Sequence, residues 1–178
     1  SMCALRVPFA VGVSSSVAEG SIVADIGASL DSERRRVNAA LERFFVAERD
    51  VADTVHPLAR EVFDTVAEFT LGPGKRLRPV LMIATYRAVG GADEEAILAA
   101  STCLELTQSM LLIHDDIMDR SELRRGRPSV HASFARRYAA SDPAHFGLAL
   151  AIAAGDLAGQ LALRALLSAP FPPDCQVR

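Results

Sequence analysis

An acidic segment, His114 to Asp119, is followed closely by a basic one, Arg124 to Pro128. On a helix, Asp115 and Asp119 are one turn apart and share a face, so their mutual repulsion must be offset by cations. Mg²⁺ suits this pair, because it binds a few carboxylates and keeps its other positions for water and phosphate oxygens. The alternative is an exposed acidic helix end, which opposes the helix dipole unless a cation lies nearby.

A second basic cluster lies upstream, where Gly72, Pro73 and Gly74 interrupt one helix and a new helix begins at about Pro79. This places Lys75 and Arg78 at a helix N-terminus. Free backbone N–H groups and the positive end of the helix dipole favour an anion there, and a diphosphate fits this chemistry. The alternative is a solvated loop with ordinary surface cations.

Three segments together resemble the trans-isoprenyl diphosphate synthases, or polyprenyl synthetases, in order and in spacing. They are GKRLRP from residue 74, QSMLLIHDDIMD from residue 108 and RRGRP from residue 124. The resemblance is close between Lys75 and Pro128 and looser in the flanking helices. Three separate motifs are more specific than an isolated DDxxD.

The resemblance implies a site made of two diphosphate positions. The first aspartate-rich motif would supply the catalytic residues and hold Mg²⁺ on the allylic diphosphate, mainly through Asp115 and Asp119, while Arg124 touches the same diphosphate. The residues implied for this position are Asp115, Asp116, Asp119 and Arg124. Those implied for the diphosphate of isopentenyl diphosphate are Lys75, Arg78, Gln108 and Arg125.

The implied reaction is a Mg²⁺-dependent, head-to-tail condensation of isopentenyl diphosphate with an allylic diphosphate. It requires no protein nucleophile, so we expect His114 and His131 to be packing or supporting residues and not catalytic bases. In the family, the positions four and five residues before the first aspartate help to form the floor of the elongation pocket. Here they are Leu111 and Met110, neither aromatic, which favours a product of geranylgeranyl length or longer.

The family's second aspartate-rich motif has no counterpart after Asp156, where Asp174 is the one remaining acidic residue. We therefore expect an N-terminal half of the enzyme, truncated, with an apolar face left open on the last helix and lined by Leu148, Ile152 and Leu163. Such a face favours association, and we expect a homodimer. Two alternatives stay open: a class I terpene cyclase, and a non-catalytic or decayed partner subunit.

The hydrophobic periodicity predicts an all-α protein, a helical bundle of the isoprenoid synthase type. Residues 1–28 show little periodicity and are expected to be a flexible leader, followed by the N-terminal part of the synthase domain in residues 29–178. The expected helices run from Asp31 towards Val51, from Pro57 to about Leu71, from Pro79 to Val89, from about Asp93 into the aspartate motif, briefly after Pro128, and from Phe146 to Leu167 as a buried helix.

The composition restricts the possible partners. A net charge of −3 argues against a nucleic-acid partner, which would need a strongly basic face. The three cysteines are odd in number and form no CxxC pair, so we expect a reducing compartment, the cytoplasm. We expect no transmembrane segment, because the most apolar stretch contains Asp156, Gln160 and Arg164. The apolar N-terminus lacks a convincing signal-peptide cleavage pattern.

Overall fold

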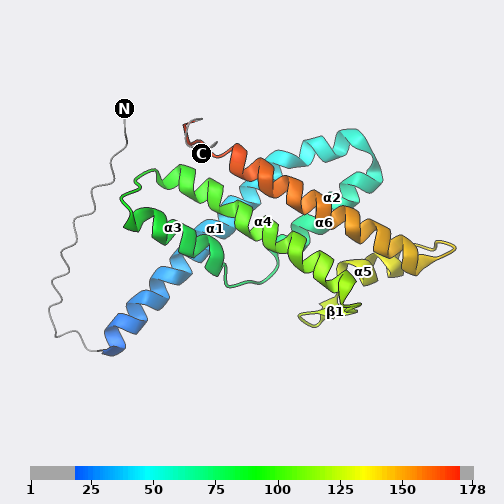
Figure 1. Ribbon diagram of the computed structural model, residues 1–178, viewed down its shortest axis with the longest axis horizontal. Coiled ribbons are helices and arrows are strands. Elements are labelled where there is room, and N and C mark those ends of the chain that lie inside the picture. Colours follow the sequence, from blue (N-terminus) through cyan, green and yellow to red (C-terminus); the bar gives the residue numbers. More distant parts are fainter. Residues whose placement is uncertain (1–18, 173–178) are drawn as a thin grey trace.

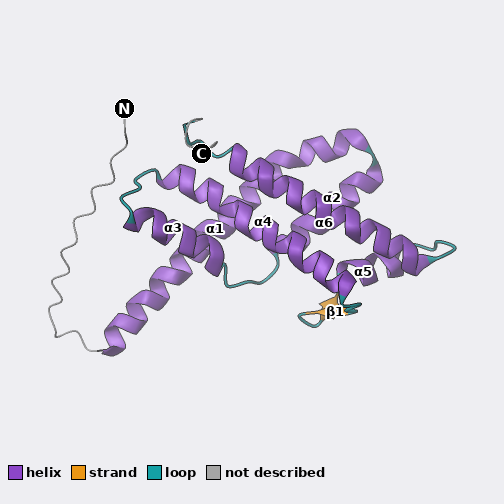
Figure 2. Ribbon diagram, in the orientation of Figure 1, coloured by secondary structure: helices purple, strands orange, loops and turns teal. Residues whose placement is uncertain are grey.

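A computed structural model describes residues 19–172 of the chain, and these fold into six helices and one short hairpin (Figures 1 and 2). The all-α prediction is therefore confirmed. The helices are α1 (Glu19–Val55), α2 (Pro57–Leu71), α3 (Leu77–Ala88), α4 (Glu94–Met118), α5 (Val130–Arg137) and α6 (Pro143–Leu167), with the antiparallel strands β1 (Leu123–Arg124) and β2 (Arg127–Pro128) between α4 and α5.

Helix α1 is longer than the sequence predicted. Residues 19–28 are helical, whereas we expected them to belong to a flexible leader, and Asp31, where we expected the helix to begin, lies inside it. Once the packed part of a helix has formed, each further residue adds one backbone hydrogen bond, so a helix can extend without an apolar face to bury. Ile26 is 54% exposed and fits this explanation. Residues 1–18 of the expected leader lie outside the described residues.

The next boundaries follow local chemistry. Pro57 occupies the first turn of α2, and His56 caps this helix by accepting a hydrogen bond from the backbone N–H of Leu58 at 3.1 Å. Helix α3 begins two residues earlier than predicted, with Pro79 in its first turn, where the missing N–H costs no helical hydrogen bond. Its N-cap, Arg76, provides no side-chain capping bond, so the first N–H groups of α3 remain available to an anion.

Helices α4 and α6 lie side by side and antiparallel, with α1 and α2 behind them (Figure 1). Small residues on α6 allow this close packing, because a Cβ atom added at Gly155 would lie 2.2 Å from the His114 ring on α4. At Gly147 an added Cβ would lie 2.5 Å from the backbone oxygen of His131 on α5. The core behind is largely aliphatic and includes Val37, Leu41, Val66, Leu106 and Ile113, all 0% exposed.

Helix α6 is buried on one face only, which corrects the expectation of a buried helix. The three side chains predicted to form an open apolar face are exposed by 36% (Leu148), 42% (Ile152) and 52% (Leu163). Helices α4 and α6 are also long and apolar enough to cross a membrane by length and composition, criteria that core helices of soluble proteins also meet. Since their most apolar windows are 56% and 44% buried in the bundle, this finding is weak evidence for a span.

Candidate functional site

The last turn of α4 separates the three motif aspartates. Asp115 and Asp119 are accessible, with the Asp115 side chain 48% exposed, whereas Asp116 is 1% exposed. Arg124 lies between the first two carboxylates: its Nε donates to both oxygens of Asp116 at 2.8 Å, and its second terminal nitrogen, Nη2, donates to Asp115 at 2.9 Å. Arg124 is therefore the cation that the acidic end of α4 needs.

The role of Asp116 differs in kind from that of its neighbours. Because both of its oxygens face Arg124 inside the protein, Asp116 fixes the guanidinium in place and offers no free oxygen to a ligand. The hydrogen bonds from Arg124 to Asp116, followed by the attraction of the two carboxylates, raise the pKa of Arg124 above its ordinary value. The catalytic role predicted for Asp116 stays a prediction, and the geometry assigns it a supporting contact.

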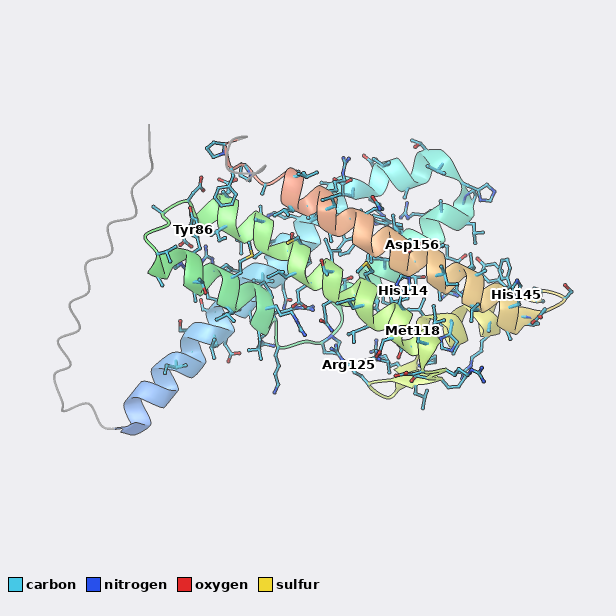
Figure 3. The ribbon with its side chains drawn as sticks, in the orientation of Figure 1. Tyr86, His114, Met118, Arg125, His145 and Asp156 are labelled. Atoms are coloured by element: carbon cyan, nitrogen blue, oxygen red, sulfur yellow. The ribbon has the colours of Figure 1, made fainter. Side chains whose placement is uncertain are left out.

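The hairpin determines where the two motif arginines point. Arg124 pairs with Arg127 across it, and Arg125 and Gly126 form the two-residue turn with φ of 53° and 76°. Positive φ at both positions is typical of a type I′ turn, which matches the twist of paired strands. Adjacent residues then diverge: Arg124 reaches back to α4, while Arg125 donates a hydrogen bond to the carbonyl oxygen of Pro73 in the α2–α3 loop. Figure 3 shows Arg125 between the hairpin and this loop.

This contact joins the two basic clusters of the sequence around one cavity of about 400 Å³. The cavity is open, and Lys75 and Arg78 in its wall are exposed. All four residues predicted to bind the diphosphate of isopentenyl diphosphate line it: Lys75, Arg78, Gln108 and Arg125. They come from the α2–α3 loop, α3, α4 and the hairpin, and the structure brings them together. We call this space the diphosphate cavity, after the ligand that the sequence predicted for these residues.

Sequence analysis did not single out Arg76, although it lines the same cavity and is only 6% exposed. It binds Glu105 of α4 at 2.7 Å, Asn38 of α1 at 2.9 Å and the carbonyl oxygen of Gly72 at 2.8 Å. Arg76 therefore anchors the α2–α3 loop, which carries Lys75, to helices α1 and α4 of the core. The signal in the sequence was Glu105 inside an apolar helix, since a buried carboxylate requires a partner.

The donor set at the end of α4 fits Mg²⁺. Asp115 and Asp119 are accessible oxygen ligands one turn apart, which agrees with the preference of Mg²⁺ for one or two carboxylates plus water and phosphate. Within residues 19–172, no group of three or more His, Cys, Asp and Glu side chains is gathered closely enough to form a complete metal site. The remaining positions would have to be filled by water and substrate oxygens.

The two histidines of the motif region contact protein groups. His114 Nε2 lies 3.4 Å from the carbonyl oxygen of Ile152 and 3.7 Å from Asp156 on α6, in the notch left by Gly155. His131 Nδ1 lies 3.2 Å from the hydroxyl of Ser129. Both contacts agree with the packing roles expected from the sequence.

The all-helical bundle places an acidic helix end beside a cavity lined by cationic side chains, and the sequence comparison identifies the family. Residues 60–177 match the family described as Polyprenyl synthetase. Since this match spans more than half of the chain, the protein belongs to the polyprenyl synthetase family.

Individual relatives agree with this assignment. A geranylgeranyl diphosphate synthase from Methanosarcina mazei is 48% identical over 61 residues, which are 34% of this chain and 18% of that protein. One from Sulfolobus acidocaldarius is 41% identical over 106 residues, which are 57% of this chain and 28% of that protein. A crystal structure of geranylgeranyl pyrophosphate synthase from Corynebacterium glutamicum, complexed with isoprenyl diphosphate and magnesium, has a TM-score of 0.73 at 30% identity and covers 81% of this chain and 43% of that one. The chain thus spans less than half the length of each of these relatives.

Proposed function

We propose that this chain carries both diphosphate positions of a trans-isoprenyl diphosphate synthase, which condenses isopentenyl diphosphate with an allylic diphosphate head to tail. The observation that carries the proposal is the convergence of Lys75, Arg78, Gln108 and Arg125 on one cavity. Arg125 is adjacent in sequence to Arg124, which is bound to the acidic end of α4. The two anionic groups of such a reaction would therefore have neighbouring but separate cationic partners.

The residues of the chain have distinct tasks in this reaction. Asp115 and Asp119 would hold Mg²⁺, which supplies Lewis-acid assistance to departure of the allylic diphosphate. Arg124 offsets negative charge at the same position and is kept in place by Asp116. Lys75, Arg78 and Arg125 bind the diphosphate of isopentenyl diphosphate and so orient its double bond towards the allylic carbon. Fixing two substrates in one geometry supplies a large part of the rate enhancement.

We propose a product of geranylgeranyl length or longer. Leu111, four residues before Asp115, lies on the same face of α4 and is 53% exposed, so this position places no aromatic ring next to the metal position. Met110 faces α6, where its sulfur atom lies 2.7 Å from the position that a Cβ atom on Gly159 would take. The relatives include geranylgeranyl diphosphate synthases and a geranylfarnesyl diphosphate synthase from Aeropyrum pernix.

The same proposal includes a homodimer, supported by the exposed side chains of Leu148, Ile152 and Leu163 on α6. It also includes a cytoplasmic location, supported by the free, buried thiol of Cys103. The proposal has no transmembrane segment, which is supported by the partial burial of α4 and α6 in the bundle. Several relatives from Arabidopsis thaliana are named chloroplastic, so the compartment varies among relatives.

Two observations favour the alternative of a partner subunit. One relative is named the large subunit of a heterodimeric geranylgeranyl pyrophosphate synthase, and in the described part of our chain no acidic cluster forms a complete metal site. A terpene cyclase accounts less well for the structure, because it would leave the diphosphate cavity without a ligand.

The test is a condensation assay on the longest natural chain that carries this sequence. It uses radiolabelled isopentenyl diphosphate, an allylic primer and Mg²⁺. Longer linear diphosphates support the synthase, and cyclic hydrocarbons indicate a cyclase. Binding of isopentenyl diphosphate without turnover, measured by calorimetry, supports the partner subunit. Absence of both binding and turnover refutes the assignment of the cavity.

A further inference from the structure

A second cavity adjoins Arg125 and is separate from the diphosphate cavity, although Arg124 and Arg125 of the proposed reaction also line it. It measures about 150 Å³ and lies between α2, the hairpin and the start of α5. Its apolar walls are Phe69, Pro73, Pro128 and Val130, and Thr65 and Ser133 also line it. We call it the hairpin cavity.

The hairpin cavity is lined by more cationic than anionic side chains. Arg124, Arg125 and Arg127 all contribute to its wall, whereas Glu68 is the one carboxylate among its lining residues. Arg124 is neutralised by Asp115 and Asp116. No described carboxylate lies within ion-pair distance of Arg125 or Arg127: Arg125 binds a neutral carbonyl group, and the guanidinium of Arg127 makes no hydrogen bond to a described residue. Two unneutralised guanidiniums therefore adjoin an apolar wall.

The geometry points to a binding site for a small organic carboxylate in the hairpin cavity. A cavity of about 150 Å³ accommodates a benzene-sized molecule. The apolar body of the ligand would lie against Phe69 and Val130, and its carboxylate would reach Arg127 and Arg125. Inorganic phosphate matches the charge but leaves the apolar wall unfilled, so an anion with an apolar body is the better match.

The location of Arg125 gives this site a regulatory consequence. Arg125 lines both the hairpin cavity and the diphosphate cavity, and its bond to Pro73 lies at their boundary. A carboxylate that recruits Arg125 removes one cation from the diphosphate cavity. The two ligands should therefore weaken each other's binding reciprocally, by an equal factor. The effect on synthesis rests on the proposed function, but the binding site itself does not.

The test uses the 178-residue chain, with 4-fluorobenzoate as the probe and ¹⁹F NMR as the readout. We expect saturable binding to the unmodified chain. Arg127→Gln should weaken binding about tenfold, because it removes a charge-assisted hydrogen bond, and Ser133→Leu should abolish it by filling the cavity. Arg136→Gln is the matched control: it removes the same charge from α5 at a side chain that is 60% exposed and does not line the cavity.

Coupling is measured by adding inorganic diphosphate, which probes the diphosphate cavity. Saturating diphosphate should weaken 4-fluorobenzoate about fivefold and then reach a plateau, as expected for two coupled sites. Displacement without a plateau would show a single shared site and overturn the proposal. So would non-saturable binding, or equal weakening by Arg127→Gln and Arg136→Gln. Because no turnover is involved, these results are independent of the condensation assay.

Discussion

Replacing Arg76 by alanine tests whether the buried ion pair holds the diphosphate cavity in shape. The Arg76 and Glu105 side chains are 5% and 10% exposed, and Nη1 of Arg76 lies 2.7 Å from Oε2 of Glu105. Removing the arginine leaves Glu105 buried without its counter-ion, and also releases Asn38 and the carbonyl oxygen of Gly72. Breaking a buried pair by removing one partner costs about 3 to 5 kcal/mol, which is a large part of the usual stability of a domain.

The backbone conformation of Arg76 makes a second contribution to stability, which can be measured separately. Its φ of 52° lies in the left-handed region, which costs roughly 1 kcal/mol for any residue with a Cβ atom. Arg76→Gly loses the same contacts as Arg76→Ala but relieves this cost. We therefore expect the glycine variant to be the more stable of the two by about 1 kcal/mol.

Urea unfolding, followed by circular dichroism, measures the stability lost in Arg76→Ala and the difference between Arg76→Gly and Arg76→Ala. Arg136→Ala is the control, because its ion pair with Glu122 is 3.7 Å long and exposed, and such pairs contribute about 0 to 1 kcal/mol. A double-mutant cycle with Glu105→Ala should show strong coupling. Additive effects of the two substitutions, or a loss below 1 kcal/mol for Arg76→Ala, would refute the structural role assigned to Arg76.

Three further predictions concern other residues. Asp119→Ala should abolish Mg²⁺-dependent condensation with unchanged helical content, whereas Asp116→Ala should also lower the urea midpoint, because it removes a buried partner; equal unfolding in both variants would contradict this distinction. Lys75→Ala should raise KM for isopentenyl diphosphate more than KM for the primer, and a matched rise would show that the two positions were misassigned. Hydrogen bonds from Arg87 and then Arg36 lower the pKa of Glu94 from 4.5 to about 2, so its stabilising effect should be complete above pH 4.5 and decline as the pH falls towards 2. Glu94→Gln should remove that part of the acid dependence in thermal melts, and an unchanged profile would exclude Glu94 as its source.

The sequence predicted those parts of the site that local pattern specifies. Helical periodicity located α2, α4 and α6, and the face shared by Asp115 and Asp119 follows from a spacing of four residues. The separate position of Asp116 was not predictable in this way, since it depends on where a hairpin returns Arg124. Arg76 was missed for a similar reason: its partners Asn38 and Glu105 lie 38 and 29 residues away in the chain.

Positive backbone angles mark the turns that assemble the site. In residues 19–172, the non-glycine residues with positive φ are Arg76, Arg120 and Arg125. Arg120 ends α4 in a Schellman motif, with its N–H bound to Ile117 and the next N–H bound to Asp116, at a position usually occupied by glycine. Glycine would cost less at all three positions, but it could not provide a cation. At Arg76 and Arg125 the guanidinium bonds explain why the cost is tolerated. Arg76 anchors the α2–α3 loop to α1 and α4, and Arg125 binds the carbonyl oxygen of Pro73 beside the diphosphate cavity. The side chain of Arg120 makes no such contact with a described residue, so positive φ coincides with a guanidinium contact at the site for Arg76 and Arg125 but not for Arg120.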